Sequence, residues 1–134
     1  MSIPNIRNAL EGALANVVTI DLVHENQSYD PTADRPYAEV YLMVAKPGNP
    51  TMGDGFYQEI GVLQINLQYP PEVGTLAAAQ QAELIRAAFK RGASFTDGGV
   101  AVIIDGTPEI GAGRIDSGAW MLPIKIPWHA DIYA

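Results

Sequence analysis

The residues best suited to chemistry in this chain are four carboxylates in its third quarter, Asp97, Asp105, Glu109 and Asp116. Two carboxylates that converge in one pocket can serve as the general acid and the general base of a hydrolase. Each of the four lies in a glycine-rich stretch, where such side chains commonly bond the backbone of a turn. We therefore interpret them as turn and strand-end residues. A small hydrolase is the alternative, and it requires the four side chains to meet.

Two short stretches resemble catalytic motifs but lack an essential residue. The stretch Asp105-Gly106-Thr107 matches the end of the phosphatase signature Asp-x-Asp-Gly-Thr, yet Ile103 stands where the nucleophilic aspartate is needed. The stretch Gly111-Ala112-Gly113 lacks the third glycine of a dinucleotide-binding loop. No serine lies in a Gly-x-Ser-x-Gly elbow. The sequence therefore predicts no catalytic residue.

The two histidines, His24 and His129, do not form a metal-binding motif. They are far apart in the sequence, and neither belongs to a His-Glu-x-x-His pattern. The chain has no cysteine, which excludes thiolate zinc sites, disulfides and cysteine nucleophiles. We predict surface histidines, no metal site and no cofactor.

The length and composition predict one domain over residues 1–134. Charged residues make up 17% of the chain, against about 25% in an average domain. The net charge is −7, with only eight lysines and arginines, so the chain lacks the positive charge that phosphate binding requires. We expect no sequence-specific binding to nucleic acid and no membrane binding. The N-terminal segment has no signal-peptide pattern, and the longest apolar run, Val100–Ile104, is too short to span a bilayer.

Helical and strand periods alternate along the chain. Apolar residues at three- and four-residue steps predict a helix over residues 3–17 and a second over residues 75–91. Alternating or continuous apolar runs predict strands at Tyr37–Val44, Leu63–Tyr69, Val100–Ile104, Glu109–Ile115 and Trp120–Trp128. The order α-β-β-α-β-β-β indicates an α+β domain: a mostly antiparallel sheet of about four to five strands, with two helices packed on one face.

Two prolines shape the expectation for the last strand. Pro123 and Pro127 are four residues apart, so both lack an N–H on the same lateral side of the strand. We therefore predict that this strand lies near an edge of the sheet. The β-branched run Val100–Ile104 is predicted to be central and covered on both faces.

A long loop and an uncharged strand face indicate that the chain assembles. Residues 46–55 contain five prolines and glycines, so neither a helix nor a sheet is expected to run through them. Around this loop lie Met52, Phe56 and Tyr57, and the strand Leu63–Tyr69 presents amides on its polar face. Burying amides in mutual hydrogen bonds costs less than burying charge, which suits a protein interface.

Several segments, in their order and spacing, carry a resemblance to one family. They are Ile6–Glu11, Glu25-Asn26 leading to Pro36-Tyr37, Gly61–Pro70, then Gly74, Ala82–Phe89 and Gly118–Ile126. In this layout the chain resembles, over essentially its full length, the tail terminator proteins of long-tailed bacteriophages and gene-transfer particles, also called tail-completion or minor tail proteins.

The resemblance implies a small α+β subunit of the virion, made in the bacterial cytoplasm, that catalyses no reaction. Such subunits form a ring, usually sixfold, on the last layer of the tail tube, where the ring halts tube growth and presents a surface to the head. The implied partners are further copies of the chain, the tail tube protein and a head-completion or connector protein. A head–tail connector, another minor tail component and a small-ligand binding module remain alternatives.

Ring closure requires each subunit to present two different patches to its neighbours. We predict Met52, Phe56 and Tyr57 as subunit contacts. The acidic balance also suggests a hypothesis for the channel: an acidic inner wall would repel DNA phosphates and let the genome slide. A basic inner wall would contradict it.

Overall fold

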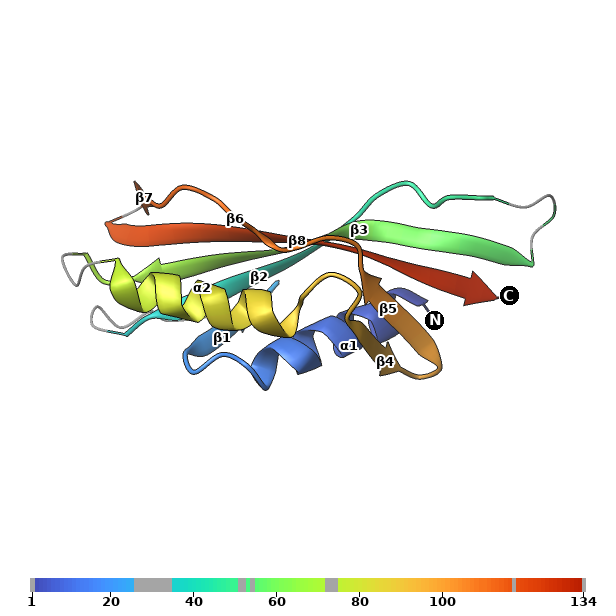
Figure 1. Ribbon diagram of the computed structural model, residues 1–134, viewed down its shortest axis with the longest axis horizontal. Helices are drawn as coiled ribbons and strands as arrows, with labels where there is room; N and C mark the ends of the chain where they lie inside the picture. The colour runs from blue at the N-terminus through green and yellow to red at the C-terminus, as the bar shows by residue number, and fades with distance from the viewer. Residues whose placement is uncertain are drawn as a thin grey trace.

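Two long strands organise the molecule. In the computed structural model, β3 (Phe56–Tyr69) and β8 (Ala119–Tyr133) pair antiparallel along the whole of β3. They run side by side along the long axis of the molecule (Figure 1). The structure describes residues 2–25, 35–50, 53, 55–71, 75–116 and 118–133.

The other strands flank this central ribbon. On the β3 side, β2 (Tyr37–Val44) pairs antiparallel with β3, and β1 (Asp21–His24) pairs parallel with β2. On the β8 side lie four short strands: β4 (Ser94–Asp97), β5 (Val100–Ile104), β6 (Glu109–Ile110) and β7 (Arg114–Asp116). The sheet order is β1-β2-β3-β8-β5-β4, with β6 and β7 also paired to β8.

The described residues therefore form eight strands, and the expected number of four to five is wrong. The observed order is α-β-β-β-α-β-β-β-β-β. The sequence pattern missed β1 and β4, which are four-residue edge strands without a fully buried position. The single strand expected at Glu109–Ile115 is two strands, β6 and β7. Residues 26–34, between β1 and β2, lie outside the described residues.

The last strand is central, which corrects its predicted place near an edge. The carbonyls of Pro123 and Pro127 accept hydrogen bonds from the backbone N–H groups of Gly111 and Asp105, both at 2.9 Å. Since the N and O atoms of one strand residue point to the same side, both prolines turn their missing N–H away from β3. The prolines thus leave the pairing with β3 intact and interrupt only the opposite flank, where four residues or fewer pair in each of β5, β6 and β7.

The strand Val100–Ile104, expected to be central, is second from an edge. It lies between β4 and β8. Only Val102 and Ile104 are buried, because one face of the strand carries no covering layer.

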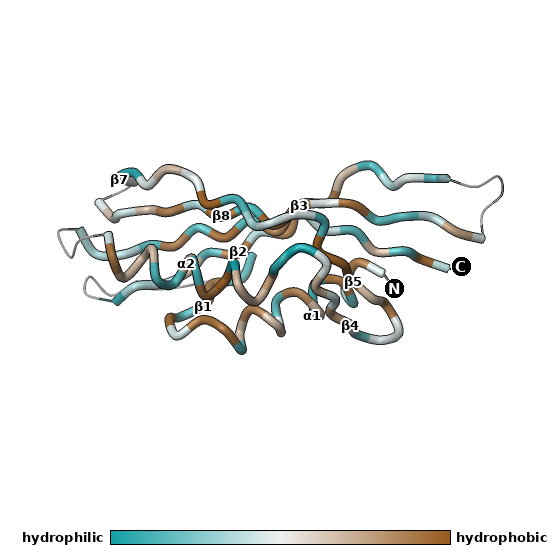
Figure 2. The backbone as a smooth tube through the Cα atoms, viewed as in Figure 1, coloured by the Kyte–Doolittle hydropathy of each residue, from teal (hydrophilic) through white to brown (hydrophobic). Residues whose placement is uncertain are grey.

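Both helices cover the same face of the sheet, as expected. α1 (Ser2–Ala15) and α2 (Leu76–Ala88) lie on one side of the ribbon (Figure 1). Their apolar stripes meet alternate residues of β2, β3 and β8 in one continuous core. Hydrophobic and hydrophilic residues alternate along these strands (Figure 2). The largest fully buried side chains are Trp128, Phe89, Ile6, Leu10, Leu14, Leu63, Ile65, Leu67, Ile85, Ile104, Ile124 and Ile126.

A close approach in the middle of the ribbon requires glycine at residue 61. A Cβ atom there would lie 2.1 Å from the carbonyl oxygen of Met43 and 2.6 Å from Cζ2 of Trp128. The fully buried indole of Trp128 therefore packs directly against Gly61, its partner in the register. Its Nε1 is buried and has no hydrogen-bond partner among the described residues.

Candidate assembly surfaces

The structure places the four residues of the hydrolase alternative at separate points of the backbone. Asp105, Glu109 and Asp116 lie beside residues 127, 125 and 119 of β8. Residues 119 and 127 are eight steps apart on an extended strand, roughly 26 Å, whereas residues 125 and 127 are roughly 7 Å apart. Asp97 ends β4, on the far side of β5 from β8. This spread contradicts a pocket shared by all four residues, and the Asp105 carboxylate contacts His129.

The two histidines bind carboxylates and are half-buried rather than fully on the surface. His24 Nδ1 contacts Oε1 of Glu11, and His129 Nδ1 contacts Oδ1 of Asp105. Within the described ranges, no three histidine, aspartate or glutamate side chains are grouped closely enough to hold a metal ion. No helix in the described part of the chain is long and apolar enough to cross a membrane.

The His24 contact belongs to a structural network that joins α1 to the sheet edge. Arg7 Nη1 donates to Oε2 of the buried Glu11 at 2.9 Å and to Oε1 of Glu25 at 3.3 Å. The same Glu25 oxygen accepts the backbone N–H of Leu42 at 2.6 Å, just past the point where β1 ends. The Glu25 carboxylate thus takes the place of the backbone carbonyl that a longer β1 would offer to Leu42. The network therefore stabilises the fold.

Beyond the helices the ribbon continues as an arm, which we define as residues 45–50, 56–60 and 129–133. Here Gly48 and Gln58 exchange backbone hydrogen bonds of 2.9 and 2.8 Å, and Ala45 donates to Ile60 at 2.8 Å. Sheet-like pairing therefore extends into residues 46–55, contrary to the prediction of a plain loop. In Figure 1 the arm extends past the helices at the end that carries the C-terminus.

Two of the three predicted contact residues, Phe56 and Tyr57, belong to this arm. Phe56 and Tyr57 are the first residues of β3 rather than loop residues. The ring of Phe56 packs on that of Tyr133, with 5.0 Å between the centroids, while Tyr133 itself is 77% exposed. Tyr57 is half-buried. Met52 lies outside the described residues.

At the base of the arm is a short exposed stretch, residues 43–46, which we call the β2 edge segment. Met43 is 47% exposed and Val44 is 42% exposed. They lie beyond Val40, where the pairing of β1 with β2 ends, and they point to opposite faces of the strand. Lys46 is also exposed and has no carboxylate partner among the described residues.

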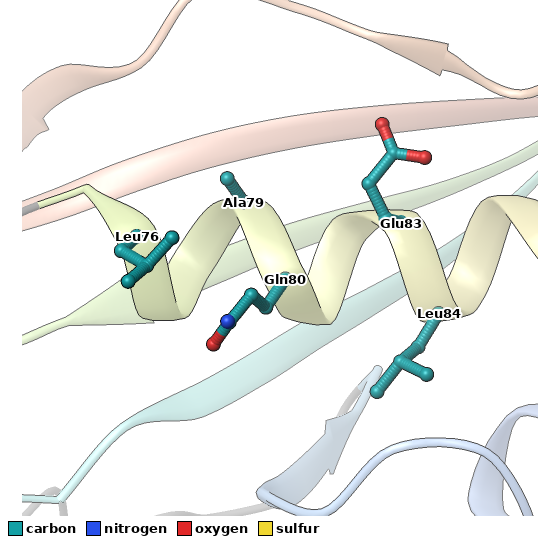
Figure 3. A pocket seen from close by; sticks show the side chains of 5 residues that line it. All are labelled: Leu76, Ala79, Gln80, Glu83 and Leu84. Atoms are coloured by element: carbon teal, nitrogen blue, oxygen red, sulfur yellow. The ribbon is translucent and has the colours of Figure 1, made fainter.

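The solvent side of α2 is a second apolar surface, which we call the α2 face. Leu76 is 69% exposed and Leu84 48% exposed, and a shallow depression of about 630 Å³ lies over the face. Ala79 and Glu83 point to one side of the helix, and Gln80 and Leu84 to the other (Figure 3). Exposed helix faces are normally rich in charge. This one has a single charged side chain among the five that line the depression.

Sequence reasoning missed the α2 face. Gln81 lies opposite the apolar stripe of this helix in the sequence pattern, yet it is buried and donates from Nε2 to Oγ1 of Thr19 at 2.9 Å. The signal that could have revealed the face is composition. Residues 76–88 contain six alanines and only two charged residues, which is sparse for a helix with solvent on one side.

The sheet face opposite the helices is polar and internally bonded. Gln68 Nε2 donates to Glu39 Oε1 at 2.8 Å, and Tyr41 OH donates to the other oxygen of Glu39 at 3.1 Å. Gln64 Nε2 donates to Asn66 Oδ1 at 3.1 Å. Partial burial, followed by the negative charge of Glu39, raises the pKa of Tyr41 above its ordinary value. The strand face of Leu63–Tyr69 presents amides, as the sequence suggested, and their use in an interface stays a prediction.

Comparison with known proteins identifies one family. A family model described as "Phage tail terminator protein" matches residues 5–128. Seventeen chains of solved structures are similar to this one. One of them, 26% identical, superimposes with a TM-score of 0.80 and covers 100% of this chain and 99% of its own length. No curated protein matches the sequence significantly.

Proposed function

Because this chain belongs to the phage tail terminator family, a family of structural tail proteins, we propose that it closes the tail tube of a long-tailed phage. In this role it forms a ring on the last layer of the tube, stops tube polymerisation and provides the surface to which the head is joined. The family match over residues 5–128 is the observation that carries the proposal.

A ring of six identical subunits is the assembly we propose. A closed ring of identical chains needs two different, complementary surfaces on each subunit. The chain carries apolar surfaces in two separate places, on the arm with its β2 edge segment and on the α2 face. Met52, Phe56 and Tyr57 are the proposed contact residues on the arm side. These surfaces support a repeating contact between copies.

The tail tube protein is the proposed partner on one rim of the ring, and a head-completion or connector protein is the partner on the other. The site of action is the virion tail, after assembly in the host cytoplasm. With a net charge of −7, the ring would let DNA pass without binding its phosphates.

The test combines native mass measurement, negative-stain imaging and tube growth. The purified protein is examined over a concentration series, and is then added to polymerising tail tube protein. We expect closed rings with a central hole and tubes whose growth stops when the protein is added. A protein that stays monomeric and leaves tube growth unchanged would overturn the proposal. A protein that acts only in joining the head to finished tubes would indicate a head–tail connector instead.

A further inference from the structure

We infer that the α2 face of one subunit receives the β2 edge segment of the next, and that this pair is the repeating contact of the ring. The occupant of the α2 face is thus a second copy of this chain. The inference rests on the proposed ring and assigns its contact to named residues.

The two surfaces match in length. From Leu76 to Leu84 the helix rises roughly 12 Å, at about 1.5 Å per residue. The β2 edge segment, residues 43–46, spans roughly 10 Å when extended. A short extended segment can therefore lie along the two helical turns that line the depression.

The two surfaces also match in chemistry. Val44 offers an apolar side chain to Leu76 and Leu84, and each of the three is more than 40% exposed in the single chain. Met43 points to the opposite face of β2 and lies outside this contact. Burying such groups together is the main source of affinity between protein surfaces.

The charges beside these apolar groups are complementary. Lys46 ends the β2 edge segment, and Glu83 is the one charged residue among the five that line the depression on the α2 face. Among the described residues of its own chain Glu83 pairs with Arg86 alone, at 3.6 Å on an exposed surface, and such a pair contributes little. A neighbouring lysine can therefore engage this carboxylate and fix the direction of the contact.

The positions of the two surfaces make the contact heterologous. α2 lies over one half of the sheet, whereas the chain leaving β2 runs into the arm at the other half (Figure 1). Each subunit can then give its β2 edge segment to one neighbour and its α2 face to another. Such head-to-tail contacts form a ring when the rotation closes.

Cross-linking tests the contact directly, because the chain has no cysteine of its own. The single variants Lys46→Cys and Glu83→Cys are treated with a short bis-maleimide, separately and mixed. We expect dimers only in the mixture, and a ladder of multimers when both substitutions are in one chain. Cross-linking of Glu83→Cys alone would place two α2 faces together and overturn the inference.

Charge reversal provides the second test. Lys46→Glu and Glu83→Lys should each raise the concentration needed for half-assembly about fivefold to tenfold, and the double variant should restore most of the loss. Lys90→Glu, an exposed lysine beyond the end of α2, is the matched control and should change it little. A double variant no better than the single ones would contradict the pairing.

The outcomes separate this contact from the proposed function. Closed rings without the mixed cross-link would overturn the contact and leave the tube-capping role intact. A protein that forms no assembly at all, with or without tubes, would overturn both.

Discussion

The two halves of β8 have the same alternating sequence pattern but differ in how deeply their apolar side chains are buried. Under the helices, Ile124, Ile126 and Trp128 are fully buried, whereas near the end of the arm Ile132, on the same face of the strand, is only half-buried. The strand and its partner β3 continue unbroken between the two regions, so the difference lies in the covering layer. The stability of this chain is therefore concentrated in the part of the ribbon that the helices cover, which we call the body. The apolar groups available for assembly lie where the covering layers stop.

Glycine substitutions should show the largest contrast between body and arm. Gly61→Ala places a methyl group against backbone and the buried indole of Trp128, so we expect a loss of about 4 kcal/mol in the free energy of unfolding. Gly55→Ala, next to the arm, meets no atom within 4 Å and should change it by less than about 0.5 kcal/mol. Urea denaturation measures both. Equal losses in the free energy of unfolding of the two variants would contradict the difference between body and arm.

Truncations along one strand give the next largest contrast. Ile126→Ala removes a fully buried side chain from the body and should cost about 3 kcal/mol. Ile132→Ala removes a half-buried side chain from the arm and should cost about 1 kcal/mol. Thermal and chemical denaturation of the two variants provide the check. A larger loss at Ile132 would place the stability in the arm.

The sequence alone predicts the body better than the arm. The helical stripe of Ile6, Leu10 and Leu14 and the strand Tyr37–Val44 are visible because burial on one face imposes a period. The sheet pairing of Gly48 with Gln58 is not visible, because glycines and prolines favour loops locally and only the partner strand overrides that preference.

The place of β8 and the α2 face also could not be predicted, for a different reason. Pro123 and Pro127 indicate that one flank is interrupted, but not that short strands fill it. The α2 face depends on which side of a helix the sheet leaves open. That choice is made by tertiary packing, as the burial of Gln81 shows.

Two buried carboxylates offer a sharper comparison of the same regions. Glu11, in the body, contacts both Arg7 and His24, so Glu11→Gln should destabilise the protein by about 2 kcal/mol. Glu59, at the base of the arm, accepts only a 3.3 Å hydrogen bond from Ser2, with no cation within 4 Å in the described part of the chain. Glu59→Gln should therefore be neutral or stabilising. The reverse order in a denaturation series would contradict this assignment.

Alkaline pH should give the smallest effect. Burial raises the pKa of Tyr69 above its ordinary value of 10.0, and a hydrogen bond with Gln81 acts weakly in the opposite direction. A tyrosine is neutral when protonated, so this burial contributes stability below pH 10 that is lost as the pH rises through the folded-state pKa. The wild type should lose more stability above pH 10 than Tyr69→Phe. Identical pH profiles of the two proteins would contradict the prediction.

The measurement that tests the central claim most directly is the native mass of two complementary variants, alone and mixed. Val44→Glu places a charge in the β2 edge segment, and Leu84→Glu places one on the α2 face. Ile115→Glu is the control, since Ile115 is 63% exposed but belongs to neither surface. Each mixed pair retains one intact β2 edge segment and one intact α2 face, enough for a single junction.

We predict that Ile115→Glu forms rings and that Val44→Glu and Leu84→Glu are each monomeric. An equimolar mixture of Val44→Glu and Leu84→Glu should form one-to-one dimers. Rings from either variant alone, or a mixture that remains monomeric while the control forms rings, would contradict it.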